Sequence, residues 1–190
     1  MRRSITPTLL AAIVSSIVGY QSSANATIWH NYKNESKCMG VGAGNMTPGT
    51  GLYLWDCDGY SDQTWNFSSF VNGGDFSQMW TSGASAPTGL PSDTSSRCAA
   101  LGNAGSTSDN QQLCIWNCSA ATLDQGWYKV LIGPDAAGHS CYYIMNEKAW
   151  NNGWGIRKVI AVKNGNMSNG AQIVLKTYDS SALDQLWCEY

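Results

Sequence analysis

Asp62-Gln63-Thr64-Trp65 returns twice further along the 190-residue chain, as Asp124-Gln125-Gly126-Trp127 and as Asp184-Gln185-Leu186-Trp187. The intervals are 62 and 60 residues. A fixed period of this kind indicates an internally repeated architecture. Gln78-Met79-Trp80 also contains Gln-x-Trp, but it lacks the preceding Asp and falls outside the period, so we treat it as a chance match. Three tetrapeptides therefore define three copies of one structural unit.

Each tetrapeptide follows two short apolar segments that are separated by a turn rich in Gly and Asn. Alternating or short apolar segments bounded by turn residues predict β-strands. A further strand is expected after the tetrapeptide in the first two copies. The unit therefore contains strand, turn, strand, tetrapeptide and strand, and the fold class is all-β. The expected strands are 37–41, 52–57 and 66–70 in the first copy, 97–101, 113–118 and 127–132 in the second, and 158–162 and 173–178 in the third.

Residues 1–26 are expected to be a secretion signal peptide. Arg2 and Arg3 precede an apolar stretch at 9–18, and Ala24-Asn25-Ala26 matches a small-x-small cleavage site. The stretch is shorter than the roughly 20 residues that a membrane span needs. We therefore expect a secreted, extracellular protein without a membrane span, in which residues 27–190 form one domain.

Composition excludes several classes of function. Without Arg2 and Arg3, nine Lys and Arg stand against thirteen Asp and Glu, a net charge of −4. This charge argues against nucleic acid as a partner. The two histidines, His30 and His139, show no metal-site spacing, and no nucleophile elbow or phosphate loop occurs. We expect a protein that is not an enzyme and that has no cofactor and no metal.

The three copies resemble the ricin B-type lectin repeat, in which a basic residue and Cys precede Leu-x-Leu/Ile-Trp-Asp/Asn-Cys and then Asp-Gln-x-Trp. The first two copies carry these residues from Lys37-Cys38 to Trp65 and from Arg97-Cys98 to Trp127. The resemblance covers nearly all of residues 28–190. It implies a β-trefoil of twelve strands with three pseudo-symmetric repeats, here about sixty residues each. Since the family repeat is nearer forty, we place the excess in long loops at 73–96 and 134–155.

The resemblance also implies structural roles. The motif tryptophans Trp65, Trp127 and Trp187 are expected to fill the core, while the Gln side chains bond backbone in the loop that they close. The family pairs the two cysteines of a repeat, which gives Cys38–Cys57 and Cys98–Cys118. Seven cysteines leave one over. Cys141–Cys188 is then the expected third pair and Cys114 the odd residue, although Cys114 and Cys118 compete for the same partner.

Sugar binding in this family uses an Asp two residues after the first Cys, an aromatic platform, and the polar residue before the Gln. The Asp is absent from every copy, because Gly40, Ala100 and Ala161 stand at its position. The third copy also has Lys176 in place of the platform. The carbohydrate-binding residues implied by the resemblance are Trp55, Asp62 and Gln63 in the first copy and Trp116, Asp124 and Gln125 in the second.

Two functions remain open from the sequence. In the first, the protein is a lectin module that binds glycans or glycoconjugates through two aromatic pockets, with further polar groups from loops. In the second, it is an accessory subunit that binds a protein partner or a toxin catalytic subunit and has lost sugar binding. Aromatic residues outside the repeat positions either pack locally beneath a long loop or form an exposed surface that would serve either function. The candidate polar groups are Asn45, Asp58, Asn103 and Asp109, and the aromatic residues are Trp29, Trp80, Trp150 and Trp154.

Overall fold

The computed structural model describes residues 26–69, 76–84, 93–151 and 157–190. The expected signal peptide lies outside these ranges, apart from Ala26. The described chain is mostly β-structure, with two short α-helices, α1 (Gly102–Gly105) and α2 (Glu147–Asn151), and five 3-10 turns of three residues each. The strands are β1 (Thr27–Asn31), β2 (Asn34–Val41), β3 (Leu52–Asp56), β4 (Thr64–Ser69), β5 (Ser77–Thr81), β6 (Asp93–Leu101), β7 (Gln111–Cys118), β8 (Gly126–Pro134), β9 (Ser140–Asn146), β10 (Lys158–Val162), β11 (Ala171–Thr177) and β12 (Trp187–Glu189).

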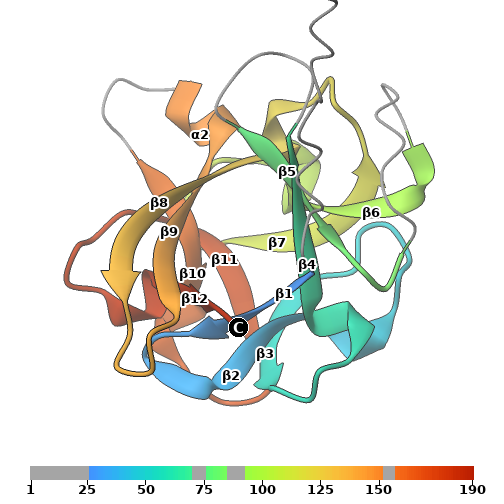
Figure 1. Ribbon diagram of the computed structural model, residues 1–190. Coiled ribbons are helices and arrows are strands. Elements are labelled where there is room, and N and C mark those ends of the chain that lie inside the picture. Colours follow the sequence, from blue (N-terminus) through green and yellow to red (C-terminus); the bar gives the residue numbers. More distant parts are fainter. Residues whose placement is uncertain (1–25, 70–75, 85–92, 152–156) are drawn as a thin grey trace, which may run out of the picture.

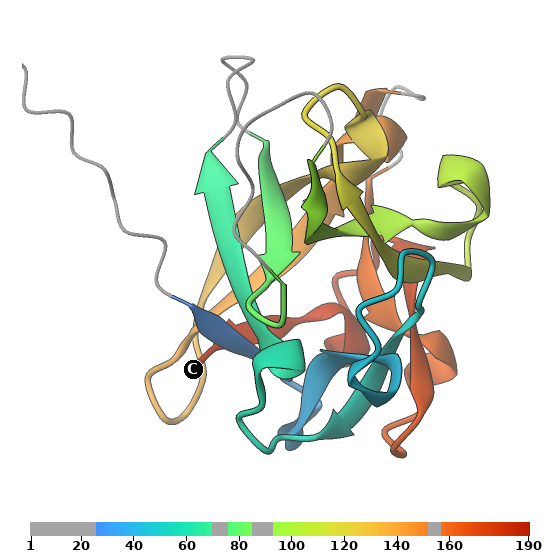
Figure 2. The same ribbon diagram turned by 90° about the vertical axis from the view of Figure 1, so that its right-hand side faces the viewer.

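Six strands form a closed ring. Antiparallel pairing runs from β1 to β4, β5, β8, β9 and β12, and β12 pairs with β1 again. The C-terminal end therefore lies beside β1, as both ribbon views show (Figures 1 and 2). Closure leaves no free edge in this ring, which removes the sites at which a sheet would pair with another chain.

The other six strands form three hairpins, β2–β3, β6–β7 and β10–β11, which pair with one another through β11–β3 and β11–β7. Each repeat thus supplies four strands, two to the ring and one hairpin, and the repeats can be followed by colour in Figure 1. This arrangement is a β-trefoil, so the predicted fold is confirmed.

The expected long loops are partly wrong. Segment 73–96 contains β5 and the start of β6, and segment 134–155 contains β9 and α2. β5 and β9 are the first strands of the second and third repeats, equivalent to β1 in the first. Buried polar residues such as Gln78 and Asn146 stand in these strands where an apolar pattern would mark a strand, so the sequence pattern predicts loops there. Gln78 donates to Gln125 Oε1 at 3.2 Å.

The core contains the motif tryptophans. Trp65, Trp127 and Trp187 are each fully buried, and each indole donates a hydrogen bond to the hairpin of its own repeat. The acceptors are the carbonyls of Met39, Ala99 and Ile160, at 2.9, 2.9 and 3.0 Å. A buried Trp thus brings both a large apolar area and a satisfied polar group. Trp29, considered above as a surface aromatic, is also fully buried in this core.

Each motif glutamine closes the loop between a hairpin and its motif. Gln63 donates to Asp56 O (2.9 Å) and accepts from Asp58 N (3.1 Å). Gln125 makes the same pair of bonds with Asn117 O and Ser119 N, and Gln185 with Thr177 O and Asp179 N, all at 2.8 to 2.9 Å. The three amides are almost completely buried. Because a buried amide without partners is costly, these bonds fix the position of the motif.

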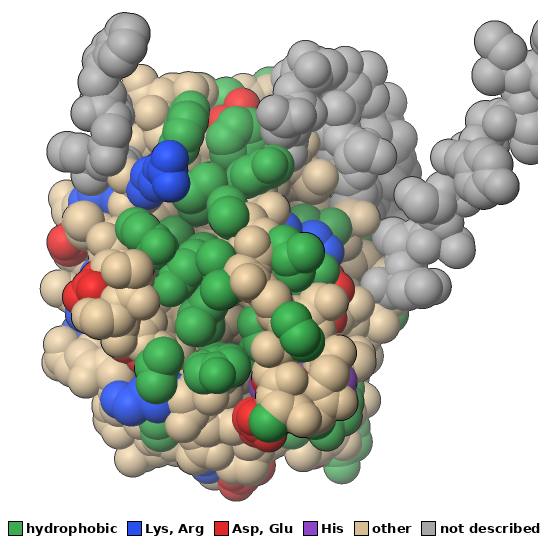
Figure 3. Space-filling model, turned by 60° about the vertical axis from the view of Figure 1, so that its left-hand side comes forward, with side chains coloured by type: hydrophobic (Ala, Val, Ile, Leu, Met, Phe, Trp, Pro, Cys, Tyr) green, Lys and Arg blue, Asp and Glu red, His purple; other side chains and the backbone are tan. Residues whose placement is uncertain are grey.

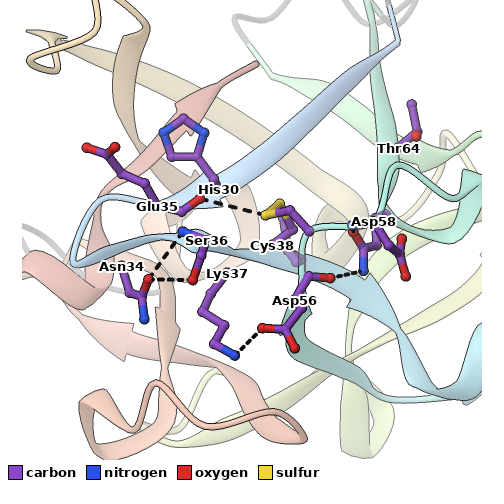
Figure 4. Close-up of a disulfide and its surroundings, with 12 residues drawn as sticks. His30, Asn34, Glu35, Ser36, Lys37, Cys38, Asp56, Asp58 and Thr64 are labelled. Atoms are coloured by element: carbon purple, nitrogen blue, oxygen red, sulfur yellow. Dashed lines mark hydrogen bonds and ion pairs between the residues drawn. A yellow bond between two sulfur atoms is a disulfide. The ribbon is translucent and has the colours of Figure 1, made fainter.

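The structure joins Cys38 to Cys57, Cys98 to Cys118 and Cys141 to Cys188, the pairs expected from the sequence, and leaves Cys114 as a buried thiol. Figure 4 shows the first disulfide between β2 and the loop after β3. The third repeat has no disulfide at this place. Apolar residues replace it there, with Val159, Tyr178 and Leu186 in one small cluster.

A carboxylate at one end of the ring holds both histidines. Asp135 Oδ2 lies 2.8 Å from His139 Nδ1 and 3.4 Å from His30 Nε2, and the Tyr190 ring stacks on His139. Burial alone would raise the pKa of Asp135. Hydrogen bonds from the His139 ring and from the backbone of His139 and Ala137 outweigh burial and hold that pKa at about 2.

Removal of a motif glutamine is expected to destabilise the fold. Gln185→Ala leaves Asp179 N–H and Thr177 C=O without their partner and should lower the free energy of unfolding by about 2 kcal/mol. Gln172→Ala is the matched control, because that amide bonds only to the side chains of Lys163 and Gln112. Urea unfolding followed by tryptophan fluorescence measures both. Equal losses in the two variants would contradict the role given to the loop amide.

The Asp135 cluster is expected to make stability depend on acid. The folded pKa lies below the ordinary value, so the ionised carboxylate stabilises the fold above about pH 4, and this contribution is lost as the pH falls towards 2. Asp135→Asn should therefore flatten the fall in the urea midpoint across that range. Parallel curves for the two proteins would count against the cluster as a source of acid sensitivity.

Candidate functional site

The first repeat carries a concave pocket beside Trp55, here called the first pocket. Its volume is about 480 Å³. The Trp55 ring is half-buried, and Tyr60, on the loop before the motif, is largely exposed. Trp55, Asp62 and Gln63, the predicted residues of this copy, all line it. The lining residues are Val41, Ala43, Gly44, Trp55, Asp56, Asp58, Tyr60, Asp62, Gln63 and Asn169.

Gly40 shows how this pocket differs from the family pattern. A Cβ at Gly40 would lie 3.0 Å from Gln63 Cγ, 3.4 Å from Asp62 Oδ2 and 3.5 Å from Trp55 Cδ1. The three predicted residues therefore converge on the position where the family has its Asp. The carboxylate of Asp62 stands next to that position, so the motif supplies a carboxylate where β2 has none.

The first pocket is acidic. Burial raises the pKa of the Asp62 carboxyl, and the nearby charge of Asp58 raises it further, against the effect of a backbone hydrogen bond. Asp56, on the pocket wall, is held differently. Hydrogen bonds from Lys37 and from Asn169 lower its pKa. Figure 4 shows Lys37 pointing to Asp56 and away from Asp58. Asn169 comes from the third repeat, so two repeats build this wall.

The second pocket lies at the equivalent place in the second repeat and has a volume of about 530 Å³. Trp116 is 50% exposed and forms its platform, and a Cβ at Gly49 would lie 3.2 Å from that ring. Asp124 lines the pocket, with Ala100 at the position of the family Asp. Gln125, whose amide makes the loop bonds described above, is not among the residues that line it.

The third repeat offers a different surface. Its pocket of about 520 Å³ is lined by Lys176, Tyr178 and Asp109 without an indole platform. Asp109 lies in the second repeat but accepts hydrogen bonds from Lys158 and Thr177 of the third.

Apolar side chains gather on the side of the molecule that carries β8 and β9 (Figure 3). Tyr128 and Ile132 of β8 are among the exposed ones.

The remaining candidates from the sequence lie in several places. Asp58 lines the first pocket and Asn103 the second, whereas Asn45 accepts hydrogen bonds from Thr47 within its own turn. Trp80 is partly buried in β5. Trp150 is 44% exposed, with the Arg157 guanidinium 5.6 Å from its ring centre. Trp154 lies outside the described residues.

No family model matches the sequence, and no curated protein matches it. Solved structures do match. The designed threefold-symmetric protein ThreeFoil is 18% identical, with a TM-score of 0.65 over 86% of this chain and 96% of its own. The β-trefoil lectin of the Vibrio vulnificus hemolysin/cytolysin is 16% identical, with a TM-score of 0.55 over 88% and 95%.

A larger protein matches as well. The exo-β-1,3-galactanase 1,3Gal43A from Clostridium thermocellum is 18% identical, with a TM-score of 0.68 over 89% of this chain. The protein spans only 30% of the galactanase chain. At these identities the comparisons establish the β-trefoil fold.

Among the described helices, none is long and apolar enough to cross a membrane.

The thiol of Cys114, which lines the second pocket, is expected to be unreactive in the folded protein. Burial, with a smaller contribution from Asp124, raises its pKa to about 11. Little thiolate then exists at about pH 8, and thiolate is the reactive form. Ellman's reagent should label no thiol in the native protein and one thiol in urea without reductant. Cys114→Ser should give none in either state. Rapid native labelling would contradict this assignment.

Proposed function

We propose that the protein is an extracellular carbohydrate-binding module of the ricin B-type lectin kind, without catalytic activity. One observation carries the proposal: an accessible indole and a carboxylate share a concave pocket in two symmetry-related repeats. Trp55 and Asp62 form one such pair, and Trp116 and Asp124 form the other. The three disulfides and the expected signal peptide support an extracellular location.

Sugar recognition explains why these residue types occur together. A pyranose has an apolar face that packs on an indole ring and a rim of hydroxyl groups that need directional acceptors. In the first pocket, Asp62 is the acceptor, and it takes over the role of the Asp that is absent at position 40. In the second pocket, Asp124 does the same beside Ala100. The third repeat has Lys176 at the platform position and is not proposed to bind sugar.

Structural relatives support a binding module. The Vibrio vulnificus trefoil is a lectin that was crystallised with N-acetyl-D-lactosamine, and it belongs to a hemolysin. The galactanase match covers a minor part of a larger enzyme. In both cases the trefoil is a unit found in a protein that acts on cells or glycans.

Protein binding is the second candidate. The observations in its favour are the apolar surface around β8 and β9 in Figure 3 and the exposed Trp150 with its neighbouring Arg157. Exposed Trp and Arg are the residue types that dominate protein interfaces. In this function the protein would be an accessory subunit, such as the cell-binding part of a toxin.

A glycan array with the protein, its Trp55→Ala and Trp116→Ala variants and the double variant tests the proposal. Each single change should weaken binding to the recognised glycan about fivefold, since an aromatic platform contributes on the order of 1 kcal/mol, and the double variant should abolish it. Trp150→Ala is the control and should bind like the parent. A blank array for the parent protein would overturn the lectin function, and a co-purifying protein released by Trp150→Ala would establish the second candidate.

A further inference from the structure

Three symmetry-related glycines allow the pockets to be compared atom by atom. Gly44, Gly105 and Gly165 occupy the same place in the turn that follows β2, β6 and β10. Their φ angles are +63°, +75° and +61°, a left-handed conformation that suits glycine. The environment that a Cβ would meet at each glycine therefore reports on the same point of the three repeats, and in the first two repeats this point lies in the pocket.

Two of these points are occupied by a lysine and a carboxylate. At Gly105 the Cβ position lies 2.6 Å from Lys148 Nζ and 3.5 Å from Asp124 Cγ. At Gly165 it lies 2.8 Å from Lys33 Nζ and 3.7 Å from Asp184 Cγ. In the second and third repeats, a lysine ammonium and the motif carboxylate thus both lie beside the turn glycine.

The point in the first repeat is open. No atom lies within 4 Å of the Cβ position at Gly44. Lys33 and Lys148 each stand two residues after an Asn, Asn31 or Asn146, whose amide bonds the backbone of the motif.

The equivalent residue in the first copy is Thr81, which bonds Ser61 O, and two residues later stands Gly83. A glycine therefore replaces the lysine. The carboxylate of Asp62 lies beside Gly40 instead, with Oδ2 3.4 Å from the Cβ position there, and no cationic side chain of the described residues contributes to its pKa.

We propose that the first pocket binds a sugar with a free amino group, a hexosamine unit whose ammonium takes the place that Lys148 and Lys33 fill in the other repeats. This inference rests on the proposed carbohydrate-binding function and names the ligand class of one of its two pockets. The sugar ring packs on Trp55, and its ammonium lies between Asp62 and the turn at Gly44.

Charge in the pocket favours this ligand. Among the described residues that line it, none is Lys or Arg. No cationic side chain contributes to the pKa of Asp62, and Lys37, on the strand beside it, is paired with Asp56. An ammonium there gains a carboxylate partner and the face of an indole ring. An anionic sugar meets Asp58 and Asp62 and is repelled. In the second repeat, Lys148 Nζ lies beside Gly105 at the edge of the pocket, so we expect no such preference there.

Calorimetry with tri-glucosamine and its fully N-acetylated counterpart at about pH 6, where the amine is protonated, tests the inference. The free amine should bind at least tenfold more tightly. Asp62→Asn should abolish this preference, whereas Asp124→Asn should leave it unchanged. Gly83→Lys restores the lysine of the other repeats and should also abolish it. Gly83→Ala should keep the amine preference. Any side chain at Gly83 crowds Met46, whose Cε lies 2.3 Å from the Cβ position, so this variant separates the effect of charge from the effect of crowding.

Equal or tighter binding of the N-acetylated sugar would overturn the inference while leaving the lectin function standing. An amine preference that survives both Asp62→Asn and Gly83→Lys would place the cation elsewhere and overturn it as well. A protein that binds no glycan on the array and neither trisaccharide would instead overturn the proposed function itself, so the two failures are distinguishable.

Discussion

The hydrogen bonds of the buried motif glutamine are the interaction on which the rest of the structure depends. One amide accepts from one backbone N–H and donates to one backbone C=O on either side of a loop, and it does so in all three repeats. The residue before it is then aimed at the pocket, and the residue two places after it enters the core. A single tetrapeptide thereby supplies both a residue that stabilises the barrel and a residue at the surface, and the buried Gln fixes the positions of both.

The fold was predictable because its determinants are local and repeated. The tetrapeptides, the hairpin strands and the disulfides within the first two repeats all lie within about thirty residues of one another, and each copy supports the reading of the next. β5 and β9 were missed because they carry buried amides where a strand pattern has apolar residues. Trp29 was misread as a surface residue for a related reason: β1 lies outside the repeated motif, so nothing in the pattern marked it as core.

The candidate sites were predictable only in part. Trp55, Asp62, Trp116 and Asp124 follow from their places in the repeat. Their neighbours do not, because Lys33 meets Gly165, Lys148 meets Gly105 and Asn169 meets Asp56 across long stretches of chain. The differences in charge among the pockets arise from these contacts between repeats. The sequence of each repeat by itself therefore does not predict which pocket carries a neighbouring lysine.

Closure of the barrel has a kinetic consequence. The ring is completed where β1 pairs with β12, which places His30 opposite Cys188, and Cys188 in turn opposite Cys141. Pairing over so great a separation loses much loop-closure entropy before it gains contacts, and topologies rich in such contacts fold slowly. The Cys141–Cys188 bond lies on this seam. Once it has formed, β12 stays tethered to β9, so the last strand is held beside the ring while it pairs with β1.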